Sequence, residues 1–187
     1  MRIVAGKHRG RPIEAPPGEA IRPTSDRARQ ALFNILAHRF LRDDGTPVLM
    51  EGRVLDAFAG TGALGLEALS RGASHVTFMD KDADAILAIG ANLRRLGENA
   101  HADVIRCDAA NPPGARRPCD IVLLDPPYRS GLAGPALVAL KKHGWFKPGA
   151  LISFEEAAKE PFTPPEGFTL IDERRYGAAR VIFLRAP

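Results

Sequence analysis

The chain has 187 residues, of which 45% are hydrophobic and 26% charged; this balance excludes a disordered chain and fits one ordinary globular domain. No apolar run approaches the about 18 residues that cross a membrane, and the N-terminus lacks a signal-peptide pattern. Cys107 and Cys119 are too few for a disulfide framework, and no Cys or His spacing indicates a metal site. We therefore expect a cytoplasmic protein with free thiols and no metal.

The net charge of +4 is distributed unevenly along the chain. Basic side chains gather in the first thirty residues: Arg2, Lys7, His8, Arg9, Arg11, Arg22, Arg27 and Arg29. Such a bias is typical of a segment that lies on nucleic-acid phosphates, and it is equally compatible with a solvated basic surface. Charge alone leaves both interpretations open.

The N-terminal region is predicted to form an arm followed by a helix. Residues 1–23, which are rich in Gly and Pro, indicate a β-hairpin or an extended arm. Thr24 or Ser25 can cap a helix in which Asp26 suits the positive end. Its core face is predicted from helical spacing to comprise Ala28, Ala31, Leu32, Ile35 and Leu36. Its solvent face is predicted to comprise Arg27, Arg29, Gln30 and Asn34.

From Arg53 onward, strands alternate with helices. Strands are predicted over 54–56, 75–79, 104–106, 120–124 and 150–154, and helices over about 62–70, between the caps Asp82 and Gly97, and over 133–142. The last strands, 168–171 and 181–184, have no helix-length segment between them and are predicted to be antiparallel neighbours. The pattern predicts an α/β fold, with a Rossmann-like, doubly wound, mostly parallel seven-stranded sheet, one antiparallel strand and an N-terminal β-hairpin and helix extension.

Four of the predicted strands end at a carboxylate: Asp56, Asp80, Asp108 and Asp125. In doubly wound sheets, ligands bind outside the carboxyl ends of the strands. A single carboxylate at such a position can simply cap the next helix. Four of them together predict one polar site along this edge of the sheet.

The glycines after the first strand match a nucleotide-binding pattern. Gly60-x-Gly62-x-x-Gly65 satisfies the dinucleotide fingerprint with Asp80 near the expected offset, so an NAD-dependent oxidoreductase is an alternative. Asp56 disfavours a pyrophosphate beside the loop and favours a cationic ligand. S-adenosylmethionine, with a sulfonium, an ammonium and no phosphate, suits such a pocket. The motifs of a P-loop and of a hydrolase nucleophile elbow are absent.

The most specific signal is Asp125-Pro126-Pro127-Tyr128, directly after the fourth predicted strand. An exocyclic amino group on a base is a poor nucleophile because its lone pair is delocalised into the ring. Asp125 and the Pro126 carbonyl can accept its two hydrogens and stabilise the charge that develops on nitrogen. The prolines fix the backbone, and Tyr128 can stack on the ring. The motif therefore favours methyl transfer to a base over a merely stiff turn.

These residues resemble a known family. Asp125-Pro126-Pro127-Tyr128 is similar to the (D/N)-P-P-(Y/F/W) motif of amino methyltransferases that act on bases, and residues 56–62 are similar to motif I of class I S-adenosylmethionine-dependent methyltransferases. Two further stretches resemble the RsmD family: residues 22–29 with Leu32-Phe33-Asn34, and residues 60–73. The resemblance covers nearly the whole chain. The resemblance implies N2-methylation of a specific guanine in bacterial small-subunit (16S) ribosomal RNA by direct transfer, which leaves S-adenosylhomocysteine.

The resemblance also implies roles for single residues. Asp56 and Gly60 should lie by the methionine end of the cofactor. Asp80 should bind the ribose hydroxyls, and Asp108 should face the adenine amino group. The implied cofactor set is Asp56, Phe58, Gly60, Gly62, Asp80, Lys81, Asp108 and Ala109. The implied catalytic set is Asp125, Pro126, Pro127 and Tyr128, and the implied RNA-binding set is Arg9, Arg11, Arg22, Thr24 and Arg27.

The resemblance further implies an RNA-binding extension over residues 1–45 and a methyltransferase domain over residues 46–187. The partner would be small-subunit ribosomal RNA within a small subunit or an assembly intermediate, and the protein would be a monomer without a membrane partner.

Three alternatives remain from the residues themselves. They are an adenine-N6 methyltransferase acting on DNA or RNA, an NAD-dependent oxidoreductase, and an RNA-binding module with an inactive site.

Overall fold

The computed structural model describes residues 1–16, 26–127 and 130–187. Its helices are α1 (Asp26–His38), α2 (Ala63–Ser70), α3 (Ala83–Leu96) and α4 (Ala133–Lys142), with a short 3₁₀ helix η1 (Asn99–His101). Its strands are β1 (Arg53–Ala57), β2 (His75–Asp80), β3 (Ala102–Arg106), β4 (Cys119–Leu124), β5 (Phe146–Ala157), β6 (Thr169–Tyr176) and β7 (Ala179–Arg185). No helix within these ranges has the length and apolarity to cross a membrane.

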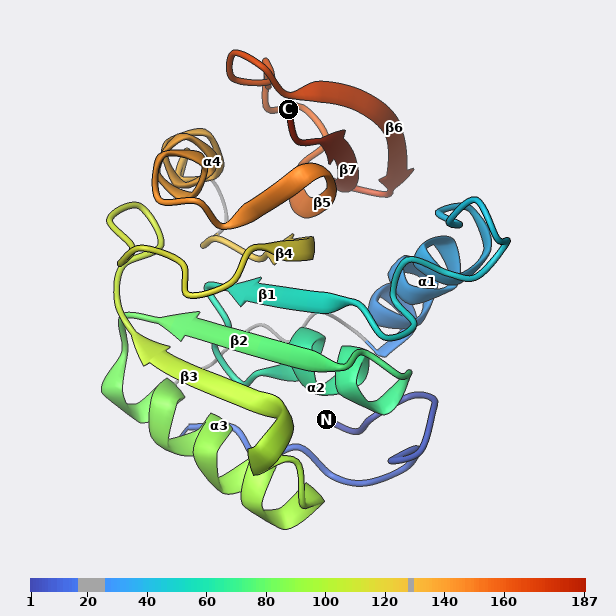
Figure 1. The fold of residues 1–187 in the computed structure, drawn as a ribbon, viewed down its shortest axis with the longest axis vertical. Coiled ribbons are helices and arrows are strands. Elements are labelled where there is room, and N and C mark those ends of the chain that lie inside the picture. The colour runs from blue at the N-terminus through green and yellow to red at the C-terminus, as the bar shows by residue number, and fades with distance from the viewer. Residues whose placement is uncertain (17–25, 128–129) are drawn as a thin grey trace.

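The strands form a seven-stranded sheet in the order β3-β2-β1-β4-β5-β7-β6, which runs from bottom to top in Figure 1. β7 is antiparallel to both of its neighbours, and the other neighbouring pairs are parallel. This confirms the predicted sheet with one reversed strand. The chain moves outward from β1 to β3 and then returns to β4 on the other side of β1. The crevice at this reversal is the place where such sheets bind ligands.

Helices cover both faces of the sheet because successive strand residues point to opposite sides. Val54 and Ile121 belong to the apolar layer that contains α1, α2, α3 and the N-terminal segment. Leu55 and Val122 belong to the layer beneath α4. All four side chains are fully buried, as expected for parallel strands covered on two sides.

The helix caps agree with the sequence pattern, whereas one strand is longer than predicted. The Asp82 side chain accepts a hydrogen bond from the Asp84 amide at 3.0 Å, and Gly97 adopts a φ of 74° beyond the end of α3. β5 extends well beyond the predicted 150–154, because Phe146 pairs with Cys119 across a register shift. The irregularity accommodates Pro148 and Gly149 within the longer strand.

The N-terminal residues form a short hairpin that joins the main core. The Ile3 amide donates to the Arg11 carbonyl and the Ile13 amide to the Met1 carbonyl, each at 3.0 Å. Ile3 and Ile13 are buried in the layer that holds α1, α2 and α3. The proposed capping residues Thr24 and Ser25 lie outside the described residues.

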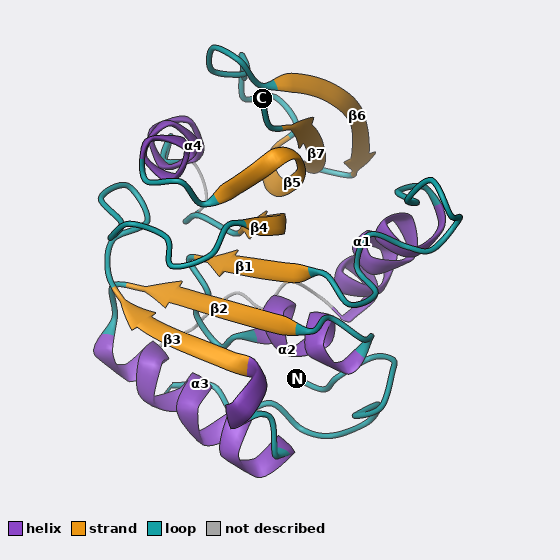
Figure 2. Cartoon of the chain, in the orientation of Figure 1, coloured by secondary structure: helices purple, strands orange, loops and turns teal. Residues whose placement is uncertain are grey.

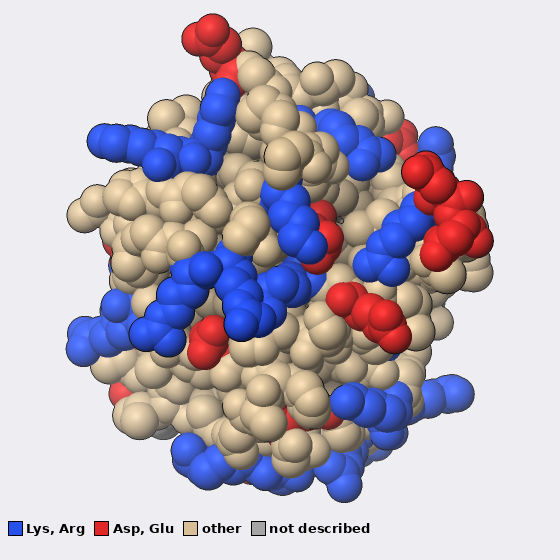
Figure 3. All heavy atoms as spheres, in the orientation of Figure 1, with Lys and Arg blue, Asp and Glu red and all other residues tan. Residues whose placement is uncertain are grey.

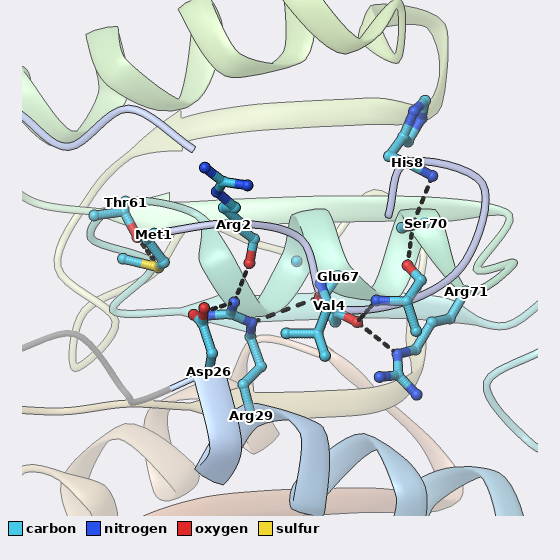
Figure 4. A network of polar contacts seen from close by, with 12 residues as sticks. Met1, Arg2, Val4, His8, Asp26, Arg29, Thr61, Glu67, Ser70 and Arg71 are labelled. Carbon is cyan, nitrogen blue, oxygen red and sulfur yellow. Dashed lines mark hydrogen bonds and ion pairs between the residues drawn. The ribbon is translucent and has the colours of Figure 1, made fainter. Parts of the chain in front are cut away.

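The predicted position of Arg29 on the solvent face of α1 is wrong. Its side chain is 0% exposed and lies between two carboxylates (Figure 4). Nη2 donates to Asp26 Oδ1 at 2.9 Å, and Nε lies 3.6 Å from Glu67 Oε2 on α2. Burial of a guanidinium requires such partners. Glu67 is 38 positions further along the chain, so the spacing within α1 could not reveal it.

Glu67 connects the N-terminal hairpin to α2. It is also 0% exposed, and its carboxylate accepts the amides of Val4 at 2.8 Å and Ala5 at 3.0 Å (Figure 4). Arg71 donates to the same group from one turn further along α2, at 2.7 Å. The hairpin is therefore held by a buried charge as well as by its apolar side chains.

Candidate active site

The carboxyl ends of the parallel strands border a cleft of about 880 Å³. The arrowheads of β1, β2 and β3 reach the same edge of the sheet (Figure 2). Residues of the loops that follow them, 58–61, 81–82 and 107–109, line the cleft. Predicted residues that line this cleft are Asp56, Phe58, Gly60, Asp80, Lys81, Asp108 and Ala109, together with Asp125, Pro126 and Pro127. The four strand-end carboxylates thus line the same cleft.

Asp56 is the most deeply buried acid of the cleft, with only 1% of its surface exposed. Its Oδ2 accepts the Gly65 amide of α2 at 2.8 Å, while Oδ1 is buried without a hydrogen-bond partner among the described residues. Burial raises the pKa of Asp56 well above its usual range, the bond from Gly65 opposes the rise, and the charges of Asp125 and Asp80 add to it. A cationic donor at Oδ1 would satisfy the carboxylate and favour its charged form.

The three glycines of the loop after β1 have different roles. Gly60 has a φ of 52° and open space where a side chain would stand, so its backbone faces the cleft. Gly62, which begins α2 with a φ of 77°, does not line the cleft, since a Cβ there would meet Ile89 at 3.0 Å. At Gly65 a Cβ would lie 2.2 Å from the Phe78 ring. Only the first glycine is therefore placed to contact a ligand directly.

Asp80 and Asp108 are held by backbone amides. Asp80 accepts from the amide of Gly60 at 2.7 Å and from that of Asp82 at 2.9 Å, which fixes the orientation of its carboxylate at the end of β2. Asp108 accepts from the Ala110 amide at 2.9 Å beyond the end of β3. Each oxygen keeps a lone pair for a second donor. Lys81 and Ala109 also line the cleft; Lys81 is exposed and Ala109 is buried.

Asp125 begins the motif that follows β4, the strand that neighbours β1. Its amide donates to the Ala57 carbonyl at 3.3 Å, which continues the pairing of β4 with β1. Pro126 is half-buried and Pro127 exposed, and both line the cleft. The Pro127 carbonyl accepts the Ser130 amide at 3.1 Å. Tyr128 lies outside the described residues.

The cleft also contains residues that the sequence analysis did not select. Met1 and Thr61 line it on the N-terminal side, with Sδ and Oγ1 4.0 Å apart (Figure 4). Glu155 and Tyr176 line it beyond Asp125. Glu155 follows the predicted strand 150–154 directly, so the strand-end rule applied to the other acids would have identified it. No comparable signal marks Tyr176, which reaches the cleft from the far end of β6.

Among the residues predicted to bind RNA, the three that the structure describes, Arg9, Arg11 and Arg27, do not line this cleft. Arg9, Arg11 and Arg27 are exposed, and Arg11 donates to the Arg95 carbonyl at 3.4 Å. The tip of the hairpin packs at Ser70, the last residue of α2, whereas the cleft adjoins the first turn of that helix. Arg22 and Thr24 lie outside the described residues.

The fold is that of class I methyltransferases. The candidate methyltransferase YhhF from Escherichia coli is similar to this chain with a TM-score of 0.82 and 34% identity, over 100% of this chain and 97% of that one. A S-adenosylmethionine-dependent methyltransferase from Aquifex aeolicus, at 15% identity, shares the fold with a TM-score of 0.62 over 85% of this chain and 89% of that one.

The family model described as "Conserved hypothetical protein 95" matches residues 1–185. Ribosomal RNA small subunit methyltransferase D from Haemophilus influenzae is 38% identical over 95% of this chain and 89% of that protein. The protein of the same name from Escherichia coli K12 is 36% identical over 95% of this chain and 85% of that protein. The chain belongs to this family, the RsmD family that the motifs predict.

Proposed function

We propose that this chain methylates the N2 amino group of a specific guanine in small-subunit (16S) ribosomal RNA, with S-adenosylmethionine as the methyl donor. The observation that carries the proposal is the placement of Asp56 and Asp125-Pro126-Pro127 in one cleft at the switch point of the sheet. The name and end-to-end similarity of the Haemophilus influenzae relative support ribosomal RNA as the substrate.

The residues of the cleft fit the proposed cofactor. Oδ1 of Asp56, which has no hydrogen-bond partner in the described part of the chain, would accept the cofactor's ammonium. Gly60 would face its methionine chain, Asp80 would hold the ribose hydroxyls and Asp108 the adenine amino group. When bound, the cofactor supplies a methyl group on a sulfonium, which needs no activation by a metal. The chain itself must align the acceptor nitrogen and manage its protons.

Asp125 and the Pro126 carbonyl would perform this second task. Both can accept hydrogens of the base amino group, which draws the nitrogen out of conjugation with the ring and directs its lone pair toward the methyl group. The Asp125 carboxylate also stabilises the positive charge that develops on that nitrogen and can receive the proton that leaves it. Tyr128, at the last motif position, is proposed to stack on the base.

Mass analysis of small-subunit RNA tests the proposal. RNA from cells that lack this protein should contain one guanine without its N2 methyl group, and purified protein with S-adenosylmethionine should restore the mark. A missing methyl group at N6 of an adenine would instead favour the adenine methyltransferase alternative. Reduction of a nicotinamide cofactor without methyl transfer would favour the oxidoreductase.

Asp56→Asn should weaken binding of S-adenosylhomocysteine by about 10- to 100-fold, because the amide keeps an acceptor for Gly65 but loses the charge that faces the ligand ammonium. Since burial raises the pKa of Asp56, the wild-type affinity should increase as pH rises through that pKa and the carboxylate loses its proton. The variant should lose this dependence. Calorimetric titration across a pH series measures both effects, and an unchanged pH profile would contradict the assignment.

The N-terminal extension, residues 1–45, is proposed to bind RNA away from the reacting base. Figure 3 shows groups of Lys and Arg side chains spread over one face of the molecule, with Asp and Glu side chains between them and in a group near its right edge. Arg9 and Arg11 are exposed at the hairpin, where phosphates could approach them. Neither side chain lines the cleft, so each would contribute to RNA affinity and not to the chemistry.

Arg9→Glu combined with Arg11→Glu should weaken RNA binding and lower the slope of log affinity against log salt by about 2, one for each lost phosphate contact. Methyl transfer at saturating RNA should keep its rate. Lys142→Glu with Lys159→Glu, two exposed positions elsewhere, gives the same change in net charge and serves as the control. Equal slopes for the two double variants would show that the hairpin is an ordinary solvated surface.

A further inference from the structure

Glu155 stands beside Asp125 in the cleft. The parallel register pairs Leu124 of β4 with Phe154 of β5, so the two acids occupy neighbouring positions just beyond this pair. Both line the large cleft, and both also line the small apolar hollow next to it, between α1 and β7. Side chains at paired positions of parallel strands point to the same side. The base-binding end of the cleft therefore contains two adjacent carboxylates.

Two adjacent acceptors match the hydrogen-bonding edge of only one of the amino-bearing bases. In guanine the N2 amino group adjoins N1–H, which is a second donor. In adenine and cytosine the amino group adjoins a ring nitrogen without a hydrogen, which is an acceptor. A carboxylate placed opposite that nitrogen would face a lone pair, an arrangement that costs binding energy and rejects the base.

We propose that Glu155 is a specificity-determining residue that accepts the N1–H of the target guanine while Asp125 holds the N2 amino group. This inference rests on the proposed function and adds to it the group that distinguishes guanine from adenine. It assigns Glu155 to recognition of the base edge and leaves the reacting nitrogen to Asp125.

The neighbouring acid Glu156 provides a matched control. It lies on the same strand one position further, it does not line the cleft, and its Oε2 is 3.5 Å from Arg180 Nη2. Glu156→Gln removes the same charge from the same strand without touching the cleft. A change seen in Glu155→Gln but absent from Glu156→Gln is therefore specific to the position in the cleft.

The test compares RNA that carries guanine at the target position with RNA that carries 2-aminopurine there, a base that keeps the 2-amino group but has no hydrogen on N1. We expect wild-type kcat/KM to be about 10- to 100-fold higher on guanine. Glu155→Gln should lower kcat/KM on the guanine RNA by about 10-fold or more. The values of kcat/KM on the two RNAs should then agree within about threefold, because an amide can accept from N1–H of guanine or donate to N1 of 2-aminopurine. Glu156→Gln should keep the wild-type ratio.

The outcomes separate the two proposals. If both wild-type and Glu155→Gln protein methylate guanine, with the same ratio of kcat/KM between the guanine and 2-aminopurine RNAs, the role of Glu155 is overturned and the proposed function stands. Methylation of adenine and never of guanine would overturn both. Binding of S-adenosylhomocysteine, measured by calorimetry, should be unchanged in Glu155→Gln, and a parallel loss of this binding would show that the residue is structural. Glu155→Ala, which cannot accept at all, should show a larger loss on guanine than Glu155→Gln.

Discussion

Asp125→Ala is expected to lower the rate of methyl transfer by about 10²- to 10⁴-fold, the range associated with loss of one positioned proton acceptor or charge-stabilising group. The carboxylate lies at the end of β4, where the hydrogen bond from its amide to Ala57 fixes the backbone. Without it, the amino group of the base loses an acceptor and the positive charge on nitrogen is no longer stabilised. Single-turnover measurements with saturating RNA and cofactor report this step directly.

The same variant should bind S-adenosylhomocysteine nearly as well as the wild type, since Asp56, Asp80 and Asp108 remain in place. Asp125→Asn should retain more activity than Asp125→Ala because its oxygen still accepts one hydrogen. Asp43→Ala, an exposed position outside the cleft, is the control for loss of an acid. If affinity for S-adenosylhomocysteine falls as far as the rate in Asp125→Ala, the residue belongs to the cofactor site and the roles need to be exchanged.

The parts of this fold that are local in sequence could be predicted, and those that depend on distant partners could not. Asp82 and Gly97 act through the nearest turn of α3, so their capping roles follow from the pattern alone. Arg29 is different, because its burial depends on Glu67 in another helix. The sequence of α1 alone cannot distinguish an arginine that is exposed to solvent from one that is buried in an ion pair.

The candidate site shows the same division. Acids at the ends of β1 to β4 could be located because strand ends in a parallel sheet meet at one edge. Glu155 satisfies the same rule at the fifth predicted strand, but it lies inside the longer β5, which continues to Ala157 as it pairs with β7. Tyr176 enters the cleft only because β6 and β7 are folded back onto β5. This is a property of the whole sheet that no local pattern contains.

Glu67→Ala is expected to lower the free energy of unfolding by about 3–5 kcal/mol, which corresponds to a fall in Tm of about 6–20 °C for a domain of this size. Two effects act together. The fully buried guanidinium of Arg29 loses one of its two carboxylate partners, and the amides of Val4 and Ala5 lose the acceptor that holds the hairpin against α2. A loss this large is a substantial share of the about 5–15 kcal/mol that stabilises a typical domain.

Equilibrium denaturation in urea measures the change, with Glu166→Ala at an exposed turn as the control. The loss of unfolding free energy in Glu67→Gln should lie between the losses in Glu67→Ala and Glu166→Ala. Its amide oxygen can still accept a hydrogen bond from one backbone amide, while the charge that faces Arg29 is gone. Protease cleavage within residues 1–13 should accelerate in Glu67→Ala more than cleavage elsewhere, since the hairpin is the segment that loses its attachment. A change below about 1 kcal/mol would mean that the cost of burying this carboxylate cancels what its contacts contribute. In that case the apolar side chains Ile3 and Ile13 would be sufficient to hold the hairpin on the core.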